Sequence, residues 1–201
     1  MAAPYELVAT PLSLYLAPTG TAFPTVDTPA ASFPVGWVPV GSNIYGPTYD
    51  TDAAGITVTH NQTFATFTPV GTTAPIKIWR TDEQLTIAIT LADITPAMYS
   101  IALNDVAITQ VVATTGVAGT SSIPLLQGIT VSTYALLARG ISSFNDQLGA
   151  QYQVPAIYQS ANPAPVFKKG APAELAITFA TILDPLGNGF GTLVQQSAAK
   201  V

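Results

Sequence analysis

Charge is scarce in this 201-residue chain, and cysteine is absent from it. Only 8% of the residues are charged, against roughly 25% in an ordinary soluble protein. Hydrophobic residues make up 48% of the chain. A monomer needs a charged surface to stay in solution, whereas a subunit covered by neighbours does not, because the centres of interfaces are depleted in charge. The composition therefore favours a protein that works in an assembly.

The missing residue types also exclude several kinds of site. Without cysteine the chain can form neither a disulfide framework nor a thiolate metal site. His60 is the only histidine, and no G-x-S-x-G nucleophile motif accompanies it, so we predict no catalytic triad, no metal and no cofactor. The net charge of −5 argues against a phosphate-binding surface, which needs clustered Lys and Arg.

A membrane-spanning run is not found either. Residues 106–138 carry no charge, but Gly, Ser, Thr and Pro at 114–124 interrupt them. No apolar run of the ~18 residues that a transmembrane helix needs is left. We interpret this stretch as buried or interface strands around a polar loop. The first ten residues lack the features of a secretory signal, so we expect the protein to act where it is made.

Most of the chain alternates apolar and polar residues, which is typical of strands with one buried face. The pattern is clearest at 84–91 and recurs at 174–183. Further strands are predicted at 12–16, 36–40, 56–60, 107–112, 130–138 and 151–158. The sequence therefore predicts one mainly β domain that spans residues 1–201.

One helix is predicted at residues 95–104. Thr95 can cap its first turn, and Pro96 suits the first helical position because its missing N–H is not needed there. Met98 and Ile101 give the helix an apolar side that can pack on a sheet. A shorter helical turn is predicted at 142–150. Together these elements predict a β-sandwich with one packed helix.

Two segments are too polar and too rich in proline or glycine for a core. Residues 1–35 contain repeated prolines, which suit an extended arm with one short strand. Residues 42–73 form a long excursion between strands, yet they carry apolar side chains that need a partner in water. We expect a contact with another subunit there, made by Ile44, Tyr45, Tyr49, His60, Phe64 and Phe67.

A small charged cluster lies nearby, at residues 77–83. It contains Lys77, Arg80, Asp82 and Glu83. Adjacent residues of a strand point to opposite faces, so the two carboxylates cannot easily flank one bond as a catalytic pair. We therefore predict no enzyme, and we assign the cluster to a strand edge or hairpin end. There it would discourage edge pairing, form ion pairs between subunits, or face a channel.

Three stretches combine into a recognisable order. GWVPVGSNIYGPTYDTDAAGITV (36–58) is a tryptophan-containing strand that runs into a glycine-rich loop, and WRTDEQLTIAITLADITPAMYSIAL (79–103) is a strand that leads to one helix. YALLARGISS and QYQVPAIYQSANPAPVFKKGAPAELAITFATILDP follow within 134–185. With the low charge, this combination resembles the major tail tube proteins of long-tailed phages and phage-like particles.

The resemblance implies a tail tube fold, sandwich-like or barrel-like, with one helix, a long loop and extended terminal arms. It implies hexameric rings stacked into the tail tube of a virion, assembled in the host cytoplasm together with tape measure and tail terminator proteins. DNA would pass through the channel without specific binding, and the negative charge suits such a wall. In this family a long loop contacts the adjacent ring, which would assign residues 42–73 to ring stacking.

One alternative is a secreted carbohydrate-binding or adhesin-type β-sandwich. Trp37, Trp79, Tyr45 and Tyr49 could supply the exposed aromatic side chains of its site. The low charge and the lack of a signal favour the assembly. A binding module should run in solution as a compact monomer, which distinguishes the two hypotheses.

Overall fold

The protein is mainly β with one short helix, as the sequence predicted. The structure is a computed structural model that describes residues 12–41, 55–92, 94–142, 145–167, 169–170, 173–184, 187 and 189–196. One antiparallel sheet has the strand order β2-β1-β7-β8-β9-β4-β3, and β10 also pairs with β8. The sheet is not closed into a barrel, because β2 and β3 end the order at opposite edges. β5 and β6 form a separate two-stranded sheet.

The elements follow the chain as listed here. The strands are β1 (Ser13–Pro18), β2 (Val38–Pro39), β3 (Thr57–Phe67), β4 (Lys77–Leu91), β5 (Thr109–Val111), β6 (Thr120–Ser122), β7 (Thr133–Ser142), β8 (Asn145–Gln159), β9 (Leu175–Thr181) and β10 (Thr192–Gln195). A 3-10 turn, η2 (Ala30–Ser32), precedes β2, and α1 (Pro96–Ala102) follows β4.

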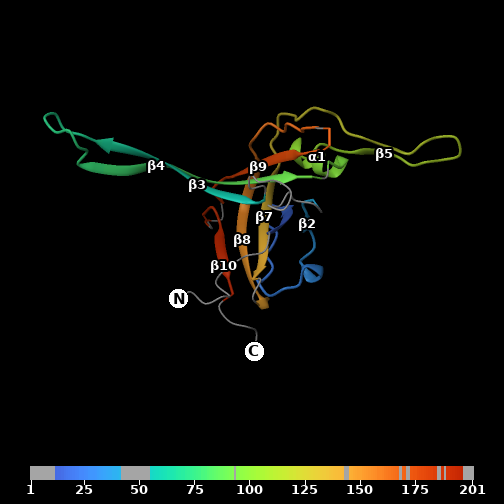
Figure 1. Cartoon of the computed structure of the whole chain (residues 1–201), viewed down its shortest axis with the longest axis horizontal. Helices are drawn as coiled ribbons and strands as arrows, with labels where there is room; N and C mark the ends of the chain where they lie inside the picture. Colours follow the sequence, from blue (N-terminus) through green and yellow to red (C-terminus); the bar gives the residue numbers. More distant parts are fainter. Residues whose placement is uncertain are drawn as a thin grey trace.

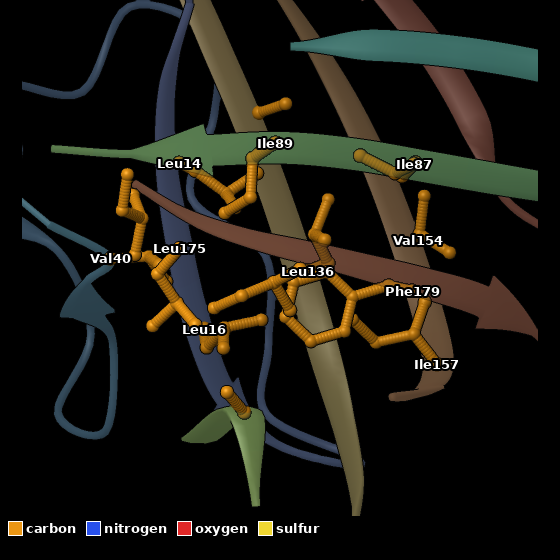
Figure 2. Close-up of a cluster of buried hydrophobic side chains, with 14 of the residues drawn as sticks. Leu14, Leu16, Val40, Ile87, Ile89, Leu136, Val154, Ile157, Leu175 and Phe179 are labelled. Atoms are coloured by element: carbon orange, nitrogen blue, oxygen red, sulfur yellow. The ribbon is translucent and has the colours of Figure 1, made fainter. Parts of the chain in front are cut away.

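The core lies between two parts of this one sheet. In Figure 2, β4 and β9 cross over β1, β7 and β8, and the side chains of both layers point into the space between them. The alternation in 84–91 is confirmed, because every second residue from Leu85 to Leu91 is buried. Phe179 of β9 is completely buried in the centre. The expected sandwich is thus one bent sheet that packs on itself. The long strand β8 takes part in both layers, because it pairs with β7 along most of its length, with β10 at residues 150–153 and with β9 at residues 157–159.

The helix begins as the sequence predicts. The hydroxyl of Thr95 accepts a hydrogen bond from the Met98 amide at 3.3 Å, and Pro96 opens the first turn. Ala102 reaches the core cluster, with Met98 and Ile101 packed against it. The second helical turn, predicted at 142–150, is wrong, because residues 145–150 belong to β8 and pair with β7. Strand pairing with β7 overrides the local preference of this stretch.

Residues 19–37, which we call the strap, fold back over the face of β7 and β8 that lies opposite the core. The buried Gln151 side chain donates to the Pro24 carbonyl at 2.8 Å. The Arg139 guanidinium donates to the carbonyls of Val26 and Thr28 and lies over the ring of Phe33. These contacts satisfy carbonyls in a proline-rich segment that has few partners of its own.

The short strand expected within residues 1–35 is present as β1, but the expectation of an extended arm is wrong for residues 19–35. β1 lies inside the sheet between β2 and β7, and the strap packs on its own domain. The Trp37 indole N–H closes the strap by donating to the Ala22 carbonyl at 3.0 Å. Residues 1–11 lie outside the described residues.

We predict that Arg139→Lys loosens the strap. One ammonium cannot reproduce the planar fork that reaches two carbonyls and stacks on Phe33. Partial burial already lowers the pKa of Arg139, and the nearby Tyr15 and Asp27 counter this effect. Losing one charge-assisted bond should cost about 1–3 kcal/mol. Hydrogen exchange at the hydrogen-bonded amides of Thr28 and Ser32 should accelerate.

The control for this prediction is Arg80→Lys, the same replacement at an arginine that is half exposed. It should leave exchange in the strap unchanged. Equal protection of the strap in both variants and in the parent chain would show that Arg139 does not hold it.

Candidate assembly surface

Two arms leave the packed domain in opposite directions (Figure 1). The β3–β4 arm, residues 61–84, continues two strands of the main sheet past its other members. The β5–β6 arm, residues 106–131, contains the separate two-stranded sheet. Both are exposed along most of their length. They are the most prominent surface features of the described residues.

The β3–β4 arm is a ribbon of two strands. Its antiparallel register runs from the pair Asn61 and Gln84 to the pair Phe67 and Lys77. β9 pairs with β4 only from Thr86 onward, so the arm lacks a third strand within the described residues. Two-stranded ribbons are at best marginally stable alone in water. We therefore expect the arm to become more stable when another chain packs against it.

A β-bulge organises the charged cluster on this arm. The register shifts between Thr63 and Phe64, so Thr81 is the extra residue of β4. Residues three apart on a regular strand face opposite sides, but the bulge brings Arg80 and Glu83 to the same face. Their side chains form an ion pair of 3.0 Å between Nη1 and Oε2.

The ion pair lies at the surface and has an aromatic neighbour. Both side chains are about half exposed, at 49% and 51%. The Arg80 guanidinium also lies 5.9 Å from the centre of the Phe64 ring. An exposed pair of this kind contributes only about 0.2–1 kcal/mol to folding. Its main effect is to keep both charges of the pair together on one face.

Large apolar side chains are exposed on the same arm. Trp79 is 47% exposed and Ile78 is 62% exposed, although the sheet buries almost every apolar residue further along β4. Phe64, Phe67, Val70 and Ile76 are exposed as well. A cluster of large apolar side chains on a protruding ribbon is typical of a binding surface.

The β5–β6 arm is tied to the domain at its base by Asn104. This residue adopts a left-handed conformation with φ of 68°, which asparagine tolerates better than most residues. Its side-chain amide donates to the carbonyls of Gln127 at 2.9 Å and Thr130 at 2.6 Å. Its side-chain oxygen accepts from the Ser132 amide at 2.6 Å. Both ends of the arm are thus held at one point.

Beyond this base, the β5–β6 arm carries no charge and many exposed apolar side chains. No Asp, Glu, Lys or Arg occurs in residues 106–131. Leu126 is 73% exposed. The others are Val111, Val112, Val117, Leu125, Ile129 and Val131. Of the two options given for 106–138, burial applies to the section in β7, whereas residues 106–131 are mostly exposed and their role as an interface stays a prediction.

The sequence-predicted contact residues fall into two groups. Phe64 and Phe67 lie on the β3–β4 arm. His60 directly precedes the arm in the chain, pairs with Leu85 and is exposed. Ile44, Tyr45 and Tyr49 lie outside the described residues. Residues 57–67 of the expected loop at 42–73 are strand β3 instead. Val58 packs against the core, but from Thr59 onward they show no clear alternation because neither face is buried.

The four charged residues singled out from the sequence lie on an open strand edge, and their role there stays a prediction. Lys77, Arg80, Asp82 and Glu83 all belong to the part of β4 that has β3 on one side only. Sequence reasoning did not single out Ile76 or Ile78. It did note the lack of charge in 106–138 and the interface option for that stretch, but it did not predict that residues 106–131 form a separate exposed arm.

No group of three His, Cys, Asp or Glu that could hold a metal ion occurs among the described residues. Asp82 and Glu83 occupy adjacent rungs of the ladder, opposite Thr63 and Gln62, so they alternate in direction. No helix in the described part of the chain is long and apolar enough to cross a membrane.

Comparison of the sequence with models of protein families and with curated proteins found no match.

Proposed function

We propose that the chain is a structural subunit of a phage tail tube that assembles into stacked rings around a channel. The observation that carries this proposal is the pair of exposed apolar arms on opposite sides of one small domain. The resemblance of three stretches of the sequence to major tail tube proteins supplies the type of assembly. In this proposal the large bent sheet with its single helix is the tail tube fold.

The distribution of charge supports self-association. The β3–β4 arm carries two positive and two negative residues, and the β5–β6 arm carries none, so both are net neutral. The whole net charge of −5 therefore lies outside the two arms. Copies of one acidic chain repel each other, and the arms are the surfaces on which they can meet without that cost.

The direction of the arms favours a head-to-tail contact. Two different surfaces on opposite sides of a subunit form a heterologous interface, which closes into a ring or continues as a filament. A tube needs both kinds of contact, one around the ring and one along the axis. Residues 42–73, including β3, remain our assignment for contacts between rings. Hexameric symmetry follows from the resemblance alone.

The acidic balance suits a channel that conducts DNA. A wall with few lysines and arginines cannot hold phosphates, so DNA would slide past it without specific binding. In this role the protein is not an enzyme and needs no cofactor. Its partners are copies of itself and other tail proteins, such as the tape measure and the tail terminator, and it resides in the virion.

The binding-module alternative retains one exposed aromatic candidate in the described residues. Trp79 is exposed, but Trp37 donates to the Ala22 carbonyl and packs 5.3 Å from the Phe23 ring. Sedimentation velocity over a range of concentrations separates the two functions. The tail tube subunit should sediment as species far heavier than its 20.8 kDa chain. A single species of monomer mass at every concentration would favour the binding module.

We predict that Asp82→Asn with Glu83→Gln weakens assembly without abolishing any chemical activity. The double variant leaves Lys77 and Arg80 unbalanced, so every β3–β4 arm becomes positive. Burying these unpaired positive charges where copies meet should cost free energy, and the salt dependence of assembly should change. The change in folding free energy should stay within about 1 kcal/mol, because only a surface ion pair is lost.

A neutral control separates net charge from the identity of the side chains. The variant that also carries Lys77→Gln and Arg80→Gln has no charge on the arm and should assemble as the parent does. Assembly that fails equally in both variants, whatever the salt concentration, would contradict the explanation by net charge.

A further inference from the structure

We propose that the two arms are the two halves of one interface: the β5–β6 arm of one copy docks along the β3–β4 arm of a second copy. This inference rests on the proposed function and specifies which surfaces meet. It concerns residues 106–131 and residues 61–84, both of which the structure describes.

The first argument is the distribution of exposed apolar side chains. Twenty large hydrophobic residues are exposed among the described residues, and thirteen of them lie on the two arms. The remaining seven are scattered over other elements, such as the strap, β2 and β10. An apolar arm is best covered by another apolar surface. On this chain the largest such surface is the other arm.

Charge is the second argument, and it identifies the occupant as a second copy. The β5–β6 arm offers no charge that could attract a charged partner. The β3–β4 arm pairs its charges internally through Arg80 and Glu83. Contact between these arms therefore brings no net charge together, although each copy carries −5 overall. An anionic lipid surface would instead repel the chain as a whole.

Open strand edges provide the third argument. The β5–β6 sheet has only two strands, and the outer part of β4 is paired only with β3. Unpaired strand edges are ready to hydrogen-bond with an extended segment of another chain. Contact between the arms can thus combine backbone pairing with apolar burial.

Geometry makes this contact intermolecular. The arms point away from each other in Figure 1, so they cannot meet within one copy. In a head-to-tail arrangement along the tube axis, each copy presents one arm to a copy in one adjacent ring and its other arm to a copy in the opposite adjacent ring. Every arm inside the tube is then covered, in agreement with the assignment of residues 42–73 to contacts between rings.

A charge-complementation experiment tests the pairing. Leu126→Lys and Ile78→Glu each place a charge at an exposed position, so the fold should be retained, which circular dichroism and thermal melting verify. Each single variant buries an unpaired charge in the interface and should raise the concentration needed for half-assembly at least about tenfold. The double variant in one chain places opposite charges on the two arms, and it should recover most of that loss. Val35→Lys, at a fully exposed position outside both arms, should assemble as the parent does.

The outcomes separate this inference from the proposed function. The inference is wrong if the parent assembles and neither single variant weakens assembly. It is also wrong if the double variant loses as much assembly as the two single variants combined. In both cases the arms do not pair, while the proposed function stands. If the parent stays monomeric at every concentration, both fail. Monomers that instead bind vesicles of zwitterionic lipid through Leu126 would assign the β5–β6 arm to a membrane and overturn the inference.

Discussion

Replacing Phe179 by alanine should destabilise the domain by about 3–5 kcal/mol, the usual cost of removing a fully buried aromatic side chain. Phe179 is completely inaccessible to solvent and lies where β9 crosses β7 and β8 (Figure 2). Its ring lies between the two layers of the bent sheet, in one cluster with residues of both. The cavity left by alanine therefore cannot close by a small local movement. Domains of this size have only about 5–15 kcal/mol of stability. Chemical denaturation should show an earlier midpoint with an unchanged slope.

Phe167→Ala is the matched control. This phenylalanine is 74% exposed and belongs to neither arm. Its removal should change the free energy of unfolding by less than about 0.5 kcal/mol. Similar losses in the two variants would mean that the core is not centred on Phe179.

Shortening the β3–β4 arm should abolish assembly while leaving the domain folded. Residues 62–83 contain no buried side chain. Asn61 pairs with Gln84, so an Asn-Gly turn inserted between these two residues can close a shorter hairpin. The buried positions of β4 begin at Leu85 and stay intact. Circular dichroism and thermal melting should resemble those of the parent, and sedimentation should show only monomers.

A second variant keeps the arm and changes its tip. Thr73→Asn with Ala74→Gly alters the exposed turn but leaves both strands in place. It should assemble normally. Normal assembly of the shortened chain would remove the arm from the interface, and an unfolded product would place the arm in the folding unit of the domain.

The parts of the fold that depend on local pattern could be predicted from the sequence. Leu85 to Leu91 alternate because one face of β4 is buried in the core. The start of α1 follows from Thr95 and Pro96, which act within a single turn. Such signals come from neighbours in the chain, so one sequence is enough to detect them.

The parts that depend on distant partners could not be predicted. The strap is held by Arg139, more than a hundred residues beyond the carbonyls that it binds. β3 continues to Phe67 because β4 pairs with it, although its side chains are largely exposed and show no burial period. The bulge at Thr81, which brings Arg80 and Glu83 together, has no local signature in this sequence.

The candidate surface was anticipated only in part for a related reason. A charged cluster stands out in a chain with so few charges, so residues 77–83 could be found directly. An uncharged apolar stretch such as 106–131 has the same composition whether it is buried in its own core or exposed for a neighbour. Only the fold distinguishes these cases, because it places 106–131 outside the sheet.

Electron microscopy of the purified, concentrated chain tests the central claim most directly. The account predicts rings or tubes with a central channel, built from repeated copies whose arms contact their neighbours. Particles of single-domain size at every concentration and salt condition, with no ring or filament, would contradict it.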